Sequence, residues 1–216
     1  MKGPEARQVR IAELRLAVDS EALPALFGLL QRGFQLELQV GVTVNELLRE
    51  QLAVSADYLR TAISTVILNG RPVDDLDAAV VEHGATVALS GAMPGLMGAV
   101  LRSGSILASF RSAISHGEGT AVGRAGSGRV RLKLFNRVMK ELAPTFLHRG
   151  VLLEPRSLLQ FVASWQETGA RAPRAEGLAG IRSATLDGRP IPFERLGDTE
   201  AFSGADLVCL SVECGR

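Results

Sequence analysis

The chain has 216 residues, a hydrophobic fraction of 46% and a formal net charge of +1. This length accommodates one large or two small domains, and the near-neutral charge gives no general attraction to nucleic acid, membranes or an acidic partner. Met1–Arg15 lacks the apolar core of a secretory signal, and no apolar run approaches the ~20 residues that span a bilayer. We therefore expect a cytoplasmic protein in which Cys209 and Cys214 are free thiols.

The first half of the chain predicts a small sheet with one helix. Phe34–Val40 alternates strictly between apolar and polar residues, as a half-buried strand does. Ala22–Leu30 is interrupted by Pro24 and Gly28, which favours a loop or a single helical turn. Thr43–Glu46 has the form of a capping box and predicts the start of a helix. The other strands predicted here are Leu14–Val18, Thr65–Leu68 and Thr86–Leu89, with a turn and short helix over Asp74–Glu82.

The second half predicts the same series of elements. An apolar helix face, in which Trp165 is expected to be a core residue, follows the second strand. The residues of that face are Leu158, Phe161, Val162 and Trp165. The predicted strands are Val130–Leu134, Val151–Glu154, Ala184–Leu186 and Leu207–Val212.

Short landmarks recur in one order and at a nearly constant separation in the two halves. Asn69-Gly70 and Asp187-Gly188 each follow an apolar run, which is the strongest local signal for a tight hairpin turn. A glycine precedes the second strand and another the last strand of each half: Gly33 and Gly150, then Gly84 and Gly204. A repeat of this length indicates a duplicated domain, because solenoid units span only about 20–50 residues.

This order of elements resembles the β-grasp fold of ubiquitin-like proteins. Val66–Val73 and Gly84–Leu89 look most like the MoaD/ThiS sulfur-carrier branch, and Lys133-Leu134-Phe135 resembles the opening strand of that family. The resemblance implies an α+β protein with two tandem β-grasp domains, each a small mixed sheet packed on one helix. The domains implied are residues 9–96 and 129–216, joined by residues 97–128.

The joining region combines an apolar helical segment with a Gly/Ser/Thr-rich linker over His116–Gly128. The preferred interpretation is that the apolar segment packs across the two domains of its own chain. The alternatives are a docking helix for a partner protein or, less favoured, contact with a membrane surface. The candidate partner-binding residues are Leu96, Met97, Leu101, Ile106, Leu107, Phe110 and Ile114.

The sequence gives no signature of catalysis, a cofactor or a metal. His83, His116 and His148 lie in three different segments without cysteines or carboxylates at metal-ligand spacing. The acidic run Asp74–Asp77 is explained as the start of a short helix. No phosphate-binding loop, nucleophile elbow or dinucleotide fingerprint is present, so we expect a protein without enzymatic activity.

Two classes of function follow. The preferred hypothesis is a scaffold that binds protein partners, and not nucleic acid, through its sheets and the central apolar segment. The alternative, implied by the resemblance, is a ubiquitin-like modifier or sulfur carrier charged by an activating enzyme. That alternative requires removal of Arg216 to expose Gly215, with Cys214 as a second candidate acceptor. A single penultimate glycine, in place of a terminal Gly-Gly pair, places the carrier hypothesis second.

Overall fold

The computed structural model describes residues 9–92, 126–171, 180–198 and 200–215, with the backbone alone over 166–171. The chain divides into two compact units. Unit 2 is the continuous range Leu30–Ala143, whereas unit 1 combines Met1–Leu29 with Pro144–Arg216. Both divisions fall inside helices, α1 (Phe27–Arg32) and α5 (Asn136–Arg149).

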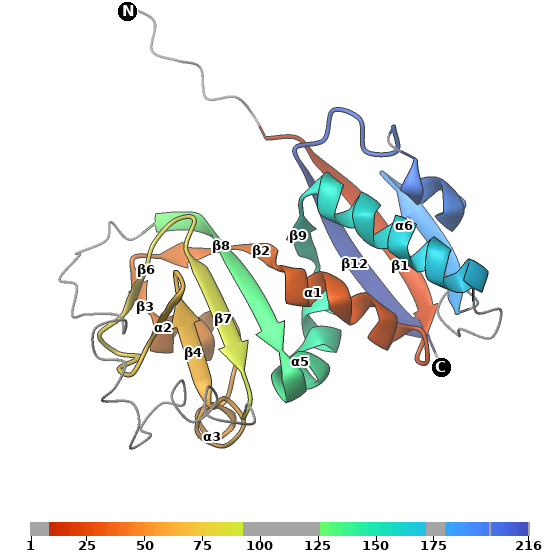
Figure 1. The fold of residues 1–216 in the computed structure, drawn as a ribbon. Helices are drawn as coiled ribbons and strands as arrows, with labels where there is room; N and C mark the ends of the chain where they lie inside the picture. The colour runs from red at the N-terminus through yellow and green to blue at the C-terminus, as the bar shows by residue number, and fades with distance from the viewer. Residues whose placement is uncertain (1–8, 93–125, 172–179, 199, 216) are drawn as a thin grey trace, which may run out of the picture. The chain divides into compact units, whose positions relative to one another are not determined.

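Unit 2 is built on a mixed sheet with the strand order β2-β8-β7-β4-β5. β8 is antiparallel to β2 and parallel to β7, and β7 is antiparallel to β4. The strands are β2 (Phe34–Val40), β4 (Thr65–Leu68), β5 (Arg71–Pro72), β7 (Thr86–Ser90) and β8 (Gly126–Phe135), with the separate pair β3 (Val42–Thr43) and β6 (Val80–Val81). The helical segments are α2 (Val44–Glu46), the π-helical turn η2 (Leu47–Gln51) and α3 (Ala56–Thr61) (Figure 1).

Unit 1 contains a sheet with the corresponding order β9-β12-β1-β10-β11. Its central strands β12 and β1 are parallel, and β9 and β10 flank them in antiparallel fashion. The strands are β1 (Ile11–Asp19), β9 (Val151–Leu153), β10 (Ile181–Leu186), β11 (Arg189–Pro190) and β12 (Leu207–Gly215). The helices are η1 (Leu23–Leu26), α6 (Pro155–Arg171) and η4 (Phe193–Gly197).

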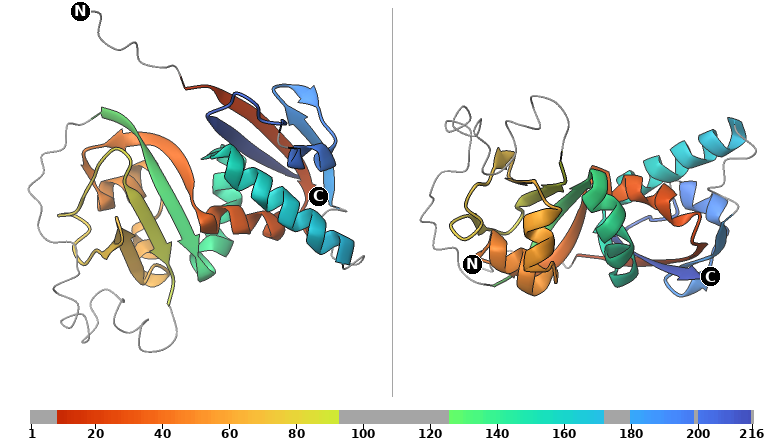
Figure 2. Two further views of the ribbon diagram at one scale, coloured as in Figure 1. Left: turned by 45° about the horizontal axis from the view of Figure 1, so that its top comes forward. Right: turned by 90° about the horizontal axis from the view of Figure 1, so that it is seen from below.

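Each sheet buries one face against helical residues. In unit 1, α6 lies over the strands β12 and β1 in Figure 1, and the right-hand view of Figure 2 shows it on one side of them. Trp165 of α6 lies between the rings of Phe161 and Phe193, with both centroid separations at 5.3 Å. In unit 2, buried Leu47 and Leu48 of η2 supply apolar side chains to the core. The expected helix face with Trp165 in the core is therefore confirmed.

The two predicted hairpin turns are confirmed and share one geometry. Asn69 and Gly70 have φ of 50° and 80°, and Asp187 and Gly188 have φ of 49° and 76°, as a type I′ turn requires. The Asn69 side chain accepts a hydrogen bond from the backbone N–H of Thr86 at 2.8 Å. Asp187 accepts the same bond from Glu13 at 2.8 Å. Each turn therefore fixes the start of a neighbouring strand, β7 in one unit and β1 in the other.

The strands β1 and β8 are exchanged between the predicted halves. β1 belongs to the first half of the sequence but lies between β12 and β10 in unit 1. β8 belongs to the second half but lies between β2 and β7 in unit 2. The compact units therefore differ from the predicted ranges 9–96 and 129–216. An alternating sequence determines which face a strand buries, but it does not specify which of two similar sheets the strand joins.

The capping box correctly predicted one helix start, whereas the helices that contain Pro24 and Pro144 were predicted poorly. Thr43 and Glu46 form the predicted capping box, with N–H···O distances of 3.2 and 2.8 Å. Ala22–Leu30, predicted as a loop or single turn, forms η1 and the start of α1, because Pro24 occupies a first-turn position where its missing N–H costs nothing. α5 was not predicted, since it contains Pro144. Asp74–Glu82 forms turns and β6, and the short helix expected there is absent from these described residues.

A polar network connects α3 to the helix that follows β8. The Tyr58 hydroxyl donates to Glu141 Oε2 at 2.5 Å, and Arg137 Nε donates to Glu141 Oε1 at 2.6 Å. These two donors, Tyr58 first, hold the pKa of Glu141 below its usual value, and burial together with the bond to Glu141 raises the pKa of Tyr58. The network stabilises the end of unit 2 that follows β8.

We predict that Glu141→Gln lowers the free energy of unfolding at pH 7 and has a smaller effect at pH 3. A carboxylate with a lowered folded-state pKa contributes stability above its unfolded value of about 4.3, and this contribution is lost as the pH falls through the folded value. Urea unfolding at both pH values measures the difference. Glu50→Gln is the matched control, because Glu50 has neither a salt bridge nor a hydrogen-bonding side-chain partner among the described residues; an equal pH dependence in both variants would contradict the prediction.

We also predict that residues 30–143 fold alone, whereas residues 9–96 do not. The fragment 9–96 lacks β8 and with it the buried side chains of Val130, Leu132 and Leu134. Burial of each contributes about 2 kcal/mol, and the sum is comparable with the whole stability of a small domain. Amide dispersion in two-dimensional NMR spectra distinguishes folded from unfolded chains. A well-dispersed spectrum of residues 9–96 would show that β8 is not required.

Candidate functional site

The side of the unit 2 sheet opposite its buried face carries a row of cations. On β8, Val130, Leu132 and Leu134 are fully buried. Arg129, Arg131 and Lys133 alternate with these residues along the strand. Their side chains therefore point to the opposite face, where they are half-buried. Alternate strand residues are about 6.6 Å apart. We call Arg129, Arg131 and Lys133 the β8 stripe.

The flanking strands add mainly uncharged side chains to this face. On β2, Gln35 lies opposite Arg131 and Glu37 lies opposite Arg129. On β7, Thr86 is paired with Arg131 and Ala88 with Lys133. Among these described positions the only acidic residue is Glu37, so the face has an excess of positive charge.

Two cations of the stripe lack a carboxylate partner. Within the described residues, neither Arg129 nor Lys133 forms a salt bridge. Glu37 is the residue opposite Arg129 in the register, yet no ion pair joins them. A half-buried cation loses hydration that only an opposite charge or hydrogen-bond acceptor replaces. The stripe is therefore suited to receive anionic groups from outside the unit.

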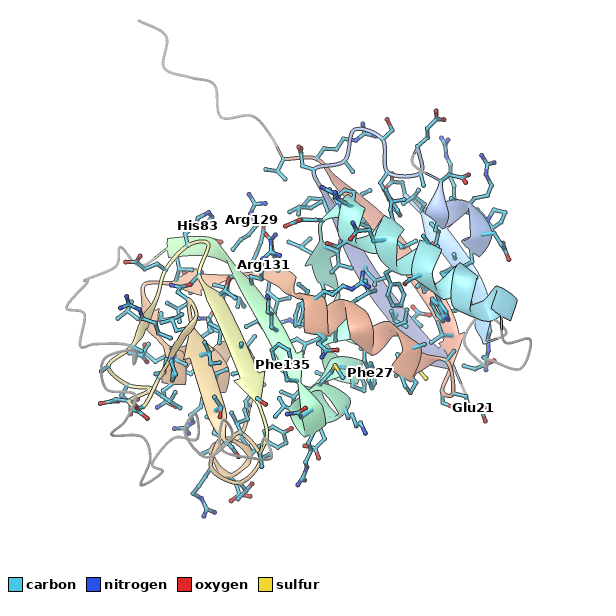
Figure 3. The ribbon with its side chains drawn as sticks, in the orientation of Figure 1. Glu21, Phe27, His83, Arg129, Arg131 and Phe135 are labelled. Carbon is cyan, nitrogen blue, oxygen red and sulfur yellow. The ribbon has the colours of Figure 1, made fainter. Side chains whose placement is uncertain are left out.

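The backbone at one end of the stripe is held by the β6–β7 turn. The N–H of Arg129 donates to His83 Nδ1 at 3.2 Å, and the N–H of Gly84 donates to the carbonyl of Arg129 at 2.7 Å. The N–H of Arg131 donates to the carbonyl of Ala85 at 2.8 Å. Figure 3 shows His83, Arg129 and Arg131 together at one end of β8, with Phe135 towards the other. His83 thus has a structural role at a strand end.

Gly33 brings its backbone close to the stems of the stripe. It has φ of +114°, a region that L-residues rarely adopt. A Cβ there would lie 3.3 Å from Cγ and Cε of Lys133 and 3.4 Å from Cδ of Arg131. The glycine therefore lets the two long side chains lie against the sheet.

The equivalent face of unit 1 carries no such stripe. Gly150 precedes β9 as Gly33 precedes β2, and Val151 pairs with Leu210 as Phe34 pairs with Leu132. This register places Leu207, Cys209 and Ser211 of β12 at the positions of Arg129, Arg131 and Lys133. The two faces thus share a backbone arrangement and differ in charge.

The candidate carrier residues lie within a strand. Cys214 pairs with Val18 and Gly215 pairs with Asp19, both across the parallel β12–β1 contact. The Arg182 guanidinium closely approaches Gly215 and is held by Asp19 at 2.5 Å. Cys214 is exposed, whereas burial first and Glu13 second raise the pKa of the half-buried Cys209 thiol. A raised pKa keeps the Cys209 thiol protonated and weakly nucleophilic.

The candidate partner-binding residues of the central segment lie outside the described residues. They are Leu96, Met97, Leu101, Ile106, Leu107, Phe110 and Ile114. In the part of the chain that is described, no group of His, Cys, Asp and Glu is arranged to hold a metal ion, and no helix has the length and apolarity needed to cross a membrane.

Unit 1 also contains an open groove of about 600 Å³ beside η4. Its walls include Leu186, Pro190 and Ile191, with Arg189 and Arg195 at the edge. Arg195 is exposed and paired with Asp198 at 3.4 Å, so its charge is already compensated. Arg189 is exposed and keeps its hydration, so the groove has a weaker claim to an anionic ligand than the half-buried cations of the β8 stripe.

Comparison of the chain with protein-family models, with curated proteins and with solved structures finds no significant match. The assignment of a site consequently depends on the geometry described above.

Sequence reasoning missed the β8 stripe, although its signal was present. The alternation Arg129-Val130-Arg131-Leu132-Lys133 was used only to predict a strand. The same alternation places three cations on one face. What the sequence lacked was the pattern of ion pairs, in which neither Arg129 nor Lys133 takes part among the described residues.

We predict that Gly33→Ala lowers the free energy of unfolding by about 2 kcal/mol, because a Cβ at this φ is strained and contacts the stems of Arg131 and Lys133. Gly70→Ala is the matched control, since Gly70 also has a positive φ but nothing lies within 4 Å of its added Cβ. Chemical denaturation of both variants measures the cost. A smaller loss for Gly33→Ala than for Gly70→Ala would show that the stems do not pack on Gly33.

Proposed function

We propose that the protein is a non-catalytic scaffold, formed by two ubiquitin-like β-grasp modules, that binds protein partners through the open faces of its sheets. The module assignment is supported by two mixed sheets with parallel central strands, one helical layer on each and matching type I′ turns. The observation that carries the function is the β8 stripe, where two half-buried cations lack a carboxylate partner.

A binding function agrees with the chemistry of the described side chains. The shifted pKa values belong to the Tyr58–Arg137–Glu141 network, which connects helices, and to Cys209, whose thiol is held in its protonated form. Shifts that activate a nucleophile would have the opposite sign for a thiol. These observations favour a protein that recognises partners over one that transforms a substrate.

The carrier alternative requires a larger rearrangement. Activation of Gly215 requires an extended tail that enters the active site of an activating enzyme, whereas Gly215 is paired with Asp19 at the end of β12. Release of Cys214 and Gly215 would break strand pairing and move the Arg182 guanidinium away from Gly215. The scaffold proposal uses the folded structure without this change.

A photo-crosslinking amino acid placed on the open face tests the scaffold proposal. We expect Ala88, a half-buried position beside the stripe, to yield discrete crosslinks to one or a few proteins in cells of the source organism. Ala56 in the first turn of α3 is the matched control, because it is an exposed alanine away from the sheet face. Mass spectrometry of the crosslinked species identifies the partners.

Crosslinks from position 88 that are absent from position 56 would support a partner on the sheet face. Equal patterns from the two positions, or none above background from position 88, would contradict the scaffold proposal for this face.

A further inference from the structure

We propose that the β8 stripe docks an acidic, extended segment of a partner protein, with carboxylates at alternate positions meeting Arg129 and Lys133. This inference deepens the scaffold proposal and rests on it. The chemical class of the partner segment is set by charge, spacing and the side chains around the stripe.

The spacing of the stripe fits an extended peptide. Successive cations on β8 are about 6.6 Å apart, and alternate side chains of an extended segment have the same separation. A segment lying along β8 with acidic residues at every second position therefore presents one carboxylate to each cation. Its remaining side chains would point away from the sheet.

The charge of the face selects for a short acidic segment. Arg129 and Lys133 are half-buried and form no salt bridge within the described residues, so a carboxylate arriving from a partner would replace lost hydration. Half-burial also weakens screening by solvent, which makes each new charge pair stronger than an exposed one. Glu37 lies opposite Arg129 on β2 and lowers the positive potential on that side of β8. The region that attracts an anion therefore follows β8.

The same face is less suited to a single-stranded nucleic acid. Such binding combines cations with several aromatic side chains on which bases stack. On the described strands of this face the aromatic residue is Phe135 alone, at the end of the stripe.

The equivalent face of unit 1 provides an internal comparison. Leu207, Cys209 and Ser211 replace the three cations there. On that face, Arg15 of β1 is exposed and bound to Glu13 at 3.2 Å, and Arg182 is bound to Asp19. Arg15 and Arg182 are therefore compensated by carboxylates of their own unit, whereas Arg129 and Lys133 of the β8 stripe are not.

The test is fluorescence anisotropy with the full chain and a labelled ten-residue peptide of alternating glutamate and threonine at low ionic strength. We expect saturable binding that weakens as salt is raised. The double variant Arg129→Glu/Lys133→Glu should lose about tenfold or more in affinity, because removing and reversing charges at a complementary surface removes both attraction and specificity. Arg131 is left unchanged, since it has other interactions.

Two controls keep the result specific. Arg15→Glu reverses one charge on the unit 1 face, as each substitution of the double variant does on unit 2, and should leave peptide affinity within about twofold of wild type. Arg129→Gln/Lys133→Gln removes the charges without reversing them and should reduce affinity by an intermediate factor. Circular dichroism of every variant verifies the fold, and the neutral pair provides the test if the reversed pair does not fold.

The proposal is overturned if the alternating peptide does not bind, or if the stripe variants and Arg15→Glu behave alike. It is also overturned if a labelled oligothymidylate binds through the stripe more tightly than the peptide, which would identify a nucleic-acid surface. If the alternating peptide does not bind but crosslinks form at position 88, the scaffold proposal stands and the partner has a different chemistry. Peptide binding without crosslinks at position 88 would contradict the scaffold proposal while supporting the anionic preference of the stripe.

Discussion

The structure depends on the pairing of two parallel strands at the centre of each sheet. β8 pairs with β7 in unit 2, and β12 pairs with β1 in unit 1. Parallel neighbours cannot be joined by a tight hairpin, so each pair needs a long connection or a strand from elsewhere in the chain. In unit 1 this strand is β1, which is separated in sequence from the rest of its sheet.

The chain passes between its units through two helices. The sequence leaves unit 1 in α1, after β1, and returns to it in α5, after β8. Each central strand buries a complete apolar face, represented by Leu14 and Leu16 in β1 and by Val130 and Leu132 in β8. Exposing either strand would forfeit several buried aliphatic side chains, at about 2 kcal/mol each. The exchange therefore makes the sheet of each unit depend on a strand from the other half of the sequence.

The buried faces of the two sheets carry similar side chains, whereas the open faces carry different ones. Equivalent core positions are apolar in both units, as Leu132 and Leu210 illustrate. Equivalent open positions differ in charge, as Lys133 and Ser211 do. Close packing restricts the first group to apolar side chains of similar size, whereas hydration permits any polar side chain in the second. Two copies of one architecture can thus present a basic surface and a neutral one without altering their cores.

Features that depend on neighbouring residues could be predicted from the amino-acid sequence. Asn69-Gly70 and Asp187-Gly188 specify type I′ turns because their backbone reaches positive φ cheaply, and Thr43 with Glu46 specifies a helix start. The faces of Phe34–Val40 and of the α6 residues around Trp165 were likewise readable from periodicity. These signals predicted two similar sets of strands and helices.

The tertiary structure alone decided which strands pair and which charges remain uncompensated. Alternation in Leu14–Val18 and Val130–Leu134 fits either sheet equally, so only long-range pairing assigns β1 to unit 1 and β8 to unit 2. Arg129 and Lys133 are plain in the sequence, but whether either forms an ion pair depends on the neighbours that β2 and β7 place around them. Register and ion pairing arise from contacts between residues far apart in sequence, and local propensity carries no information about such contacts.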